Sequence, residues 1–295
     1  MLNIRTIINV AKSQQRQVQI GTHDGIFHAD EVFAIAMIAD ACNALGAEYT
    51  VTRTRNPEIL AGCDLRVDVG GKYCPETGDF DHHQDASLPA SCNLVWDDIA
   101  EEEIKQYALD TLLNPISGLD CNFTKFSSEN PIGIYKTVGQ AIMDFNDIDG
   151  DQNFAFHSAL STASVILGNT IRKAYQHNAN IQIIKSGTPV GEFGLELSKA
   201  ISYNEYRDEI GYRHILVYPD PVSGWCVVSL DTNQTNLSSS QELFGAVFAH
   251  KAGFFAKFDS RETAVKCAAE WSESRSQEID QWAVCHNGGN GARTN

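Results

Sequence analysis

The chain has 295 residues, 43% of them hydrophobic and 20% charged, which is typical of a globular protein long enough for two domains. Its 38 acidic and 22 basic residues give a formal net charge of -16, which argues against a protein that tracks long nucleic acid with a broad basic face. The sequence has no run of about 18 apolar residues, so no membrane-spanning segment is expected.

The eight cysteines are scattered and form no C-x-x-C pair, which argues against both a zinc knuckle and a disulfide scaffold. Reduced thiols predict a cytosol-like compartment. Residues 1–23 carry Arg5, Lys12 and Arg16 and no acid, so two interpretations stay open. One is an organelle-targeting peptide, and the favoured one is a leading strand or helix. A cytoplasmic location is predicted, with targeting left open.

Strands and helices are expected to alternate in the first part of the chain. The pattern predicts strands at Val18–Thr22, Tyr49–Arg53 and Leu65–Val69, a helix at Glu31–Leu45 and a helix-like turn at residues 56–58. This order is typical of βαβ units, so the fold class is α/β with a mostly parallel sheet. Ligands of such sheets lie beyond the carboxyl ends of the strands, so His23, Arg53, Asp68 and Asp81 are expected to share one edge.

Helices are expected next along the chain, followed by short strands. Residues 94–113 and Ile132–Phe145 are predicted to be helical, with a loop at residues 114–131. A helix at Phe154–Tyr175 is long enough to link two domains. Beyond it, the pattern predicts short strands at Ile181–Ile184, Ile215–Tyr218 and Trp225–Leu230, and a closing helix at Ser260–Trp282.

Histidine and acidic side chains gather in four places, most of them beside apolar strand-like runs. Imidazole and carboxylate groups without cysteine suit manganese, magnesium, iron or zinc. Two such ions can clamp the attacking and leaving oxygens of a phosphoryl transfer. The predicted metal ligands are His23, His28, Asp30, Asp68, His82 and Asp149.

Further roles follow from neighbouring positions. Asp68, at a strand end, is the natural bridge between two ions, and Asp81 is expected to hold His82 in its metal-binding tautomer. His83 is then expected to face the substrate phosphate or the leaving oxygen. Each residue alone also has an ordinary interpretation: Asp30 is acceptable as a helix N-cap and Asp149 as a turn residue. The joint occurrence of the four clusters favours the metal site.

A phosphate-bearing substrate also needs cationic contacts. Arg53 and Arg55 follow the second strand, and guanidinium groups suit bidentate phosphate binding. His250, before Gly253, is a second candidate. An exposed strand end and an ordinary strand-to-turn histidine are the respective alternatives, and spacing alone does not decide between them.

Several motifs closely resemble the Myg-type (melanocyte-proliferating-gene) exonuclease family, a branch of the DHH phosphoesterases. In the first half they are His23–Glu31, Arg53–Arg55, Val67–Gly71 and Phe80–Gln84, and in the second half Tyr218–Pro221, Gly224-Trp225 and Phe248–Phe254. The resemblance implies a DHH-like metal-binding domain at residues 1–153, a connector helix at 154–177 and a smaller mixed-sheet, DHHA1-like substrate-binding domain at 178–295.

The same resemblance implies a site that holds two divalent ions, Mn²⁺ first and Mg²⁺ second, and trims RNA from its 3′ end. By it, His28 stands where many relatives place an aspartate, and Asp149 matches the last acidic ligand of the family. The loop after Phe254 departs from the family, which continues with a glycine pair where this chain has Phe255-Ala256-Lys257. Lys257 is a candidate substitute charge for substrate binding.

The sequence therefore predicts a two-metal phosphodiesterase, a 3′–5′ exoribonuclease acting on RNA ends or short oligonucleotides. Two alternatives remain: a catalytically silent nucleotide- or RNA-binding protein, and a phosphohydrolase of small nucleotides or cyclic dinucleotides. RNA or a short oligonucleotide is the expected partner, with no membrane partner. Exposed apolar residues in the 154–175 helix permit a homodimer without requiring one.

Overall fold

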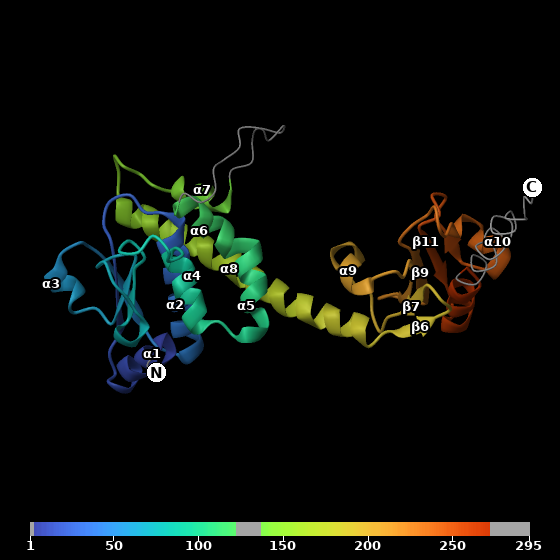
Figure 1. The fold of residues 1–295 in the computed structure, drawn as a ribbon, viewed down its shortest axis with the longest axis horizontal. Helices are drawn as coiled ribbons and strands as arrows, with labels where there is room; N and C mark the ends of the chain where they lie inside the picture. The colour runs from blue at the N-terminus through green and yellow to red at the C-terminus, as the bar shows by residue number, and fades with distance from the viewer. Residues whose placement is uncertain (1–2, 122–136, 272–295) are drawn as a thin grey trace, which may run out of the picture. The chain divides into compact units, whose positions relative to one another are not determined.

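The computed structural model describes residues 3–121 and 137–271. The chain divides into two compact units, Met1–Gln176 and His177–Asn295, and the long helix α8 passes from one to the other (Figure 1). The predicted domain limits at 1–153, 154–177 and 178–295 stay predictions.

The first unit contains a five-stranded sheet in the order β2-β1-β3-β5-β4. Its strands are β1 (Val18–Thr22), β2 (Tyr49–Arg53), β3 (Leu65–Val67), β4 (Tyr73–Cys74) and β5 (Asp79–Phe80). All adjacent pairs are parallel except β4–β5, which is antiparallel at the edge. The predicted α/β class and mostly parallel sheet are confirmed.

Seven α-helices described within the first unit precede α8: α1 (Ile4–Ser13), α2 (Ala29–Leu45), α3 (Pro57–Leu60), α4 (Ser91–Ile99), α5 (Glu102–Ala108), α6 (Asn114–Asp120) and α7 (Val138–Met143). A π-helical turn, Leu109–Leu113, joins α5 to α6. In α2, apolar side chains are buried on every face, which fits its alanine-rich composition and its central place among α1, α4, α6 and α7. The helical interpretation of the first residues is confirmed, because Ile4, Ile8 and Ala11 of α1 join the core.

The expected loop at residues 114–131 and the expected helix at 132–145 agree only in part with the structure. The loop expected at residues 114–131 is wrong for residues 114–120, which form α6. The helix tolerates Pro115 because this residue lies in the first turn, where its missing N–H costs no hydrogen bond. Residues 122–136, with the rest of that loop and the start of the helix expected at 132–145, lie outside the described residues. The later part of that helix is present as α7.

The helix α8 (Gln152–Lys185) contains the predicted helix at 154–175 and continues ten residues further. Phe156, Leu160 and Ala163 bury their side chains in the core of the first unit. The strand expected at Ile181–Ile184 is wrong. These residues form the last turns of α8, where helix continuation and burial of Ile184 override the β-propensity of isoleucine.

The second unit contains a six-stranded sheet in the order β10-β11-β9-β8-β7-β6, antiparallel except for the β7–β8 pair. The strands are β6 (Thr188–Val190), β7 (Gly194–Glu196), β8 (Ile215–Pro219), β9 (Trp225–Ser229), β10 (Phe248–Ala249) and β11 (Phe255–Phe258). Alternate residues of β8 enter two cores, Ile215 and Val217 on one face and Leu216 and Tyr218 on the other. The predicted mixed sheet of the second part of the chain is thereby confirmed.

Short helices accompany this sheet: α9 (Arg207–Ile210), α10 (Ser240–Phe244), and residues 261–271, which begin the closing helix. The part of that helix expected beyond residue 271 lies outside the described residues. Within the described ranges of both units, no helix combines the length and apolarity that crossing a membrane requires.

Candidate metal centre

The candidate site lies at the carboxyl ends of three adjacent parallel strands. His23 follows β1, Asp68 follows β3, and Asp81, His82 and His83 follow β5. Arg53 ends β2 at the same edge. The expectation that these strand ends share one edge therefore matches the topology, because parallel strands deliver their following residues to the same side.

Asp68 has an unusual backbone conformation for a residue other than glycine. Its φ is +56°, in the left-handed region, and Gly70 and Gly71 follow with φ of +102° and +64°. This conformation ends β3 abruptly and leaves the Asp68 side chain buried. A strained backbone is retained where the surrounding structure requires the side chain in one place, which marks Asp68 as a functional candidate.

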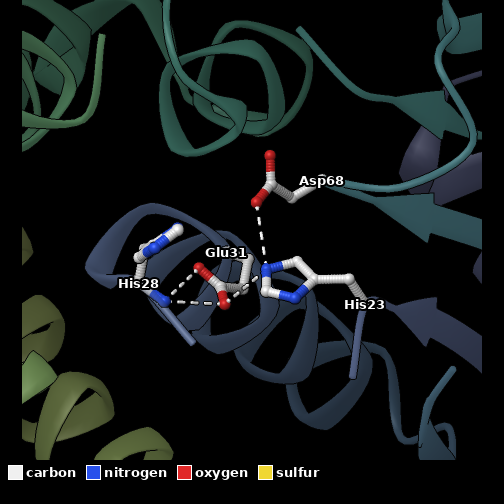
Figure 2. A group of neighbouring side chains, drawn as sticks. All are labelled: His23, His28, Glu31 and Asp68. Carbon is white, nitrogen blue, oxygen red and sulfur yellow. Dashed lines mark hydrogen bonds and ion pairs between the residues drawn. The ribbon is translucent and has the colours of Figure 1, made fainter. Parts of the chain in front are cut away.

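His23 faces two carboxylates through one ring nitrogen. Nε2 lies 3.0 Å from Glu31 Oε1 and 3.4 Å from Asp68 Oδ2 (Figure 2). The other nitrogen, Nδ1, lies 3.0 Å from the Asp24 carbonyl, to which an Nδ1–H donates. That hydrogen bond fixes the tautomer with the Nε2 lone pair facing the acids, the arrangement of a metal-binding histidine.

The carboxylates of Glu31 and Asp68 both face the lone pair of His23 Nε2, so a cation is needed between these three groups. In the metal-free protein this cation is a proton: burial acts to lower the pKa of His23, but hydrogen bonds to Asp68 and Glu31 raise it to about 10. A divalent ion would satisfy the same three ligand atoms.

The second oxygen of Asp68 faces a different pair of histidines. Oδ1 lies 3.3 Å from His82 Nε2 and 3.5 Å from His83 Nδ1, and it accepts a hydrogen bond of 3.0 Å from Ser91 Oγ at the start of α4. Although burial acts to raise the pKa of Asp68, the neighbouring His23 and His82 rings hold it well below the usual range. Asp68 is thus an ionised carboxylate with one oxygen toward each histidine group, as a bridging ligand requires.

Asp120, at the end of α6, is a further member of the cluster that the sequence did not single out. Its Oδ2 lies 3.3 Å from His82 Nε2, and its Oδ1 lies 3.8 Å from His28 Nδ1. The carboxylates of Asp120 and Asp68, both close to Nε2, raise the pKa of His82 to about 10. Asp120 therefore places a carboxylate from a separate helix beside His82 and His28, where it can act as a metal ligand together with them.

Asp30 is fully buried in the first turn of α2, and its Oδ1 has no hydrogen-bond partner among the described residues. Burial, with the charge of Asp68 adding to it, raises the pKa of Asp30 well above the usual range. The buried Nε2 of His82 also lacks a well-oriented hydrogen bond, although two carboxylates face it. Unpaired buried polar atoms are costly, and bound cations would satisfy both.

The donor set fits divalent ions. Four groups have ligand atoms within 4.8 Å of one another: His23, His28, Glu31 and Asp68; Asp68, His82 and His83; His28, Asp30 and Asp120; His82, Asp120 and Cys121. Apart from the last group, the ligands are imidazole and carboxylate, as expected.

Two sequence expectations differ from this arrangement. Asp149, expected as the last acidic ligand, is exposed in the turn before α8 and belongs to none of the four groups, whereas Asp120 does. Asp81 contacts His83 rather than His82: its Oδ1 lies 2.8 Å from His83 Nδ1, and its Oδ2 accepts from Gly71 N at 2.6 Å. Asp81 therefore ties the loop after β5 to the loop after β3 and orients the exposed His83 ring.

Glu31 is the other residue that the sequence did not assign. Its carboxylate accepts the His28 backbone N–H at 2.8 and 2.9 Å, which caps α2, and also reaches His23. The spacing of His28 and Glu31, with the acid three residues after the helix cap, is the signal that predicts such a capping carboxylate. The cap thereby holds His28 next to the cluster.

The two arginines at this edge have different surroundings. Arg53 is held inside the unit, where it donates to the Gly25 and Gln152 carbonyls and stacks on the rings of Phe27 and Phe156. Arg55 is exposed, pairs with Asp24, and lines a cleft of about 770 Å³ together with His23, His28, Asp68 and His83. Of the two, Arg55 is the one available to a ligand.

The remaining predicted substrate contacts lie in the second unit. His250 sits in the turn between β10 and β11, where its Nδ1 accepts from Ala252 N at 3.1 Å and its ring lies 4.3 Å from that of Phe254. Lys257, on β11, lies 3.2 Å from Asp220 Oδ1. Their roles as substrate contacts stay predictions.

Similarity to a known family model lies in the first unit, in the stretch that carries the strand-end motifs. The model of a family described as MYG1_exonuc, uncharacterised protein family UPF0160, matches residues 19–89. The MYG1 exonuclease of Mus musculus is 50% identical over 66 residues, which are 22% of this chain and 17% of the mouse protein. The matched stretch thus spans less than a fifth of that relative.

Two other relatives match over most of the chain. A MYG1 protein of Schizosaccharomyces pombe is 26% identical over 318 residues, covering 85% of this chain and 96% of that protein. The MYG1 protein of Chlamydia muridarum is 26% identical over 276 residues, covering 83% and 93%.

Among solved structures, exonuclease RecJ bound to manganese matches with a TM-score of 0.30 and 14% identity over 93% of this chain and 94% of that one. RecJ of Thermus thermophilus in complex with Mn²⁺ has a TM-score of 0.27 and 13% identity, over 93% of this chain and 55% of that one. The residues of the strand-end site lie within or beside the stretch that the family model matches. The sequence matches therefore confirm the resemblance to the MYG1 exonuclease family, and the family model places it at residues 19–89.

Proposed function

We propose that the protein is a metal-dependent phosphodiesterase that removes nucleotides from the 3′ end of RNA or short oligonucleotides. One observation carries the proposal: the buried Asp68 carboxylate presents one oxygen to His23 and the other to His82 and His83. This is the arrangement that a pair of divalent ions sharing a carboxylate needs. The name exonuclease of the mammalian relatives supports the same chemistry.

Mn²⁺ is the proposed metal, with Mg²⁺ as the second choice. Mixed imidazole and carboxylate ligands favour Mn²⁺ over Mg²⁺, which prefers oxygen ligands and retains its waters. His23 and Glu31 would hold one ion and His82 and Asp120 the other, with Asp68 shared. Asp30, beside Asp120, and His28 would complete the set.

Bound ions would supply charge neutralisation at the phosphate and a more acidic water for the in-line attack. The protein's own groups then perform the remaining tasks. The Asp24 carbonyl and Ser91 hydroxyl fix the orientations of His23 and Asp68. His83 is exposed at the mouth of the cleft with its Nδ1 on Asp81, so its Nε2 is the group placed to give a proton to the departing oxygen.

Binding of only the end of an RNA strand suits the net charge of -16, because a negatively charged protein disfavours contact with a long stretch of phosphate backbone. Arg55, at the wall of the cleft, is proposed to contact a phosphate, and His250 and Lys257 to contact the substrate from the second unit. A cytoplasmic location is proposed with this, supported by the free state of the seven described cysteines. A homodimer stays a prediction, with Val165 of α8 as an exposed apolar side chain.

The test is to incubate the purified full chain with 5′-labelled RNA and Mn²⁺ and to resolve the products by length. The proposal predicts stepwise shortening of the labelled strand with release of mononucleotides, and no shortening in EDTA. Rapid release of the labelled end would show the opposite polarity. If mononucleotides and cyclic dinucleotides are hydrolysed and RNA is not, the substrate class is wrong; if RNA binds without turnover in Mn²⁺, Mg²⁺, Co²⁺ and Zn²⁺, the enzyme proposal fails.

A further inference from the structure

The cluster contains one sulfur ligand atom that the proposed chemistry does not use. Cys121 follows α6 directly after Asp120, and its Sγ lies 3.8 Å from His82 Nδ1. The ligand atoms of His82, Asp120 and Cys121 all lie within 4.8 Å of one another. The chain thus brings nitrogen, oxygen and sulfur donors together at one edge of a site otherwise built from nitrogen and oxygen.

His82 joins this sulfur to the hard-ligand site. Its Nε2 faces Asp68 and Asp120, whereas its Nδ1 faces Cys121. A neutral imidazole has a lone pair on one ring nitrogen and a proton on the other. His82 can therefore bind a cation on the Nε2 side or on the Nδ1 side, but as a neutral ring not on both.

The two sides differ in chemical softness. Carboxylates surround the Nε2 side and suit Mn²⁺ or Mg²⁺, whereas a thiolate favours Zn²⁺ and similar soft cations. Asp120 lies next to Cys121 in the chain and reaches both histidines, with Oδ2 3.3 Å from His82 Nε2 and Oδ1 3.8 Å from His28 Nδ1.

We propose that His82, Asp120 and Cys121 form a binding site for a thiophilic divalent cation of the Zn²⁺ class, and that this cation competes with the hard metal for His82. On binding, the Cys121 S–H bond breaks, its proton goes to solvent, and a sulfur–metal bond forms. Zinc then withdraws His82 and Asp120 from the Asp68 side of the cluster. The inference concerns metal binding and stands whether or not the protein cleaves RNA.

Co²⁺ is the direct probe, because a thiolate ligand gives bound cobalt a near-ultraviolet charge-transfer absorption that nitrogen and oxygen ligands do not. We expect this absorption when Co²⁺ is added to the reduced, metal-free full chain. It should disappear in Cys121→Ser, Cys121→Ala and His82→Gln. It should remain in Cys74→Ser, the matched control, because Cys74 is also partly exposed and has a carboxylate neighbour, Glu76.

A second readout follows competition between metals. Protein loaded with Mn²⁺ is titrated with Zn²⁺, and released Mn²⁺ is followed by electron paramagnetic resonance. In Cys121→Ser, displacement should need about tenfold or more zinc than in the unsubstituted protein, since loss of one supporting group costs at least that factor in affinity. Absence of the cobalt absorption, its persistence in Cys121→Ser, or equal zinc requirements in the two proteins would each overturn the proposal.

Discussion

His23 Nε2 lies 3.4 Å from Asp68 Oδ2, which joins the end of β1 to the end of β3 through a histidine and a carboxylate. Neither residue is near the other in sequence, and both are buried. The contact exists because β1 and β3 are neighbouring parallel strands paired at Thr22 and Val67.

Asp68→Asn should abolish activity while leaving the fold intact. Asparagine tolerates the left-handed backbone that Asp68 adopts, so it adds no conformational strain, whereas alanine would. The loss of the shared negative charge should lower the rate of RNA shortening by about a hundredfold or more. Rates with saturating Mn²⁺ and circular dichroism in EDTA measure the two effects. Retention of wild-type rate would show that Asp68 is not a bridging ligand.

Asp120 and Asp149 offer a direct comparison between structure and sequence expectation. Asp120→Asn should weaken Mn²⁺ binding by about tenfold or more, because it removes a carboxylate that faces His82 and His28. Asp149→Asn is the matched control and should bind Mn²⁺ like the unsubstituted protein, since Asp149 is exposed outside the cluster. Calorimetric titration gives both affinities, and the reverse ranking would restore the sequence expectation.

The sequence was informative where local pattern and topology agree. Short apolar runs that end just before His23 and near Asp68 predict parallel strands whose ends meet, and the structure has them so. No apolar run precedes Asp81, where the structure has the two-residue strand β5. The helix after His28 and the polar cluster at its start were likewise visible, although the capping role of Glu31 was not assigned.

The sequence was less informative where position depends on long-range packing. Asp120 lies in a segment with Pro115 and Gly118, which weaken any helical pattern, and it enters the site only because α6 packs against α2 and α4. The turn of Asp147-Ile148-Asp149 carries a denser acidic signal and yet is exposed. Local composition does not distinguish these two acids, because tertiary contacts decide which one the chain buries.

The two arginines of the edge should behave differently when replaced. Arg55→Ala should raise the KM for RNA and leave the melting temperature unchanged, because Arg55 is exposed at the cleft and its ion pair with Asp24 is solvated. Arg53→Ala should lower the free energy of unfolding by about 1–3 kcal/mol, through loss of two carbonyl hydrogen bonds and stacking on Phe27 and Phe156.

Steady-state kinetics and urea unfolding separate these effects. A rise in KM for Arg53→Ala at unchanged stability, with no change for Arg55→Ala, would contradict the assignment.

The metal-free protein should lose stability as the pH rises from about 6.5 to about 10. The pKa of His23 and of His82 is about 10 in the folded state, above the value of about 6.5 in an unfolded chain. A raised folded pKa contributes stability that is complete below the unfolded value and disappears as the pH passes the folded one. Urea unfolding in EDTA across this range measures the loss.

His23→Gln is the control for other groups that titrate in the same range, and it should show a shallower decline. A flat or rising free energy of unfolding between these pH values would contradict the described ion pairs. Metal binding should show the opposite trend, with Mn²⁺ affinity increasing with pH, because His23 and His82 must release protons to bind.

The most direct test of the central claim is electron paramagnetic resonance of the full chain titrated with Mn²⁺. A carboxylate shared between two ions predicts a spin-coupled spectrum from a manganese pair, lost in Asp68→Asn. Binding of isolated, uncoupled Mn²⁺ in both proteins, or of none, would contradict the account.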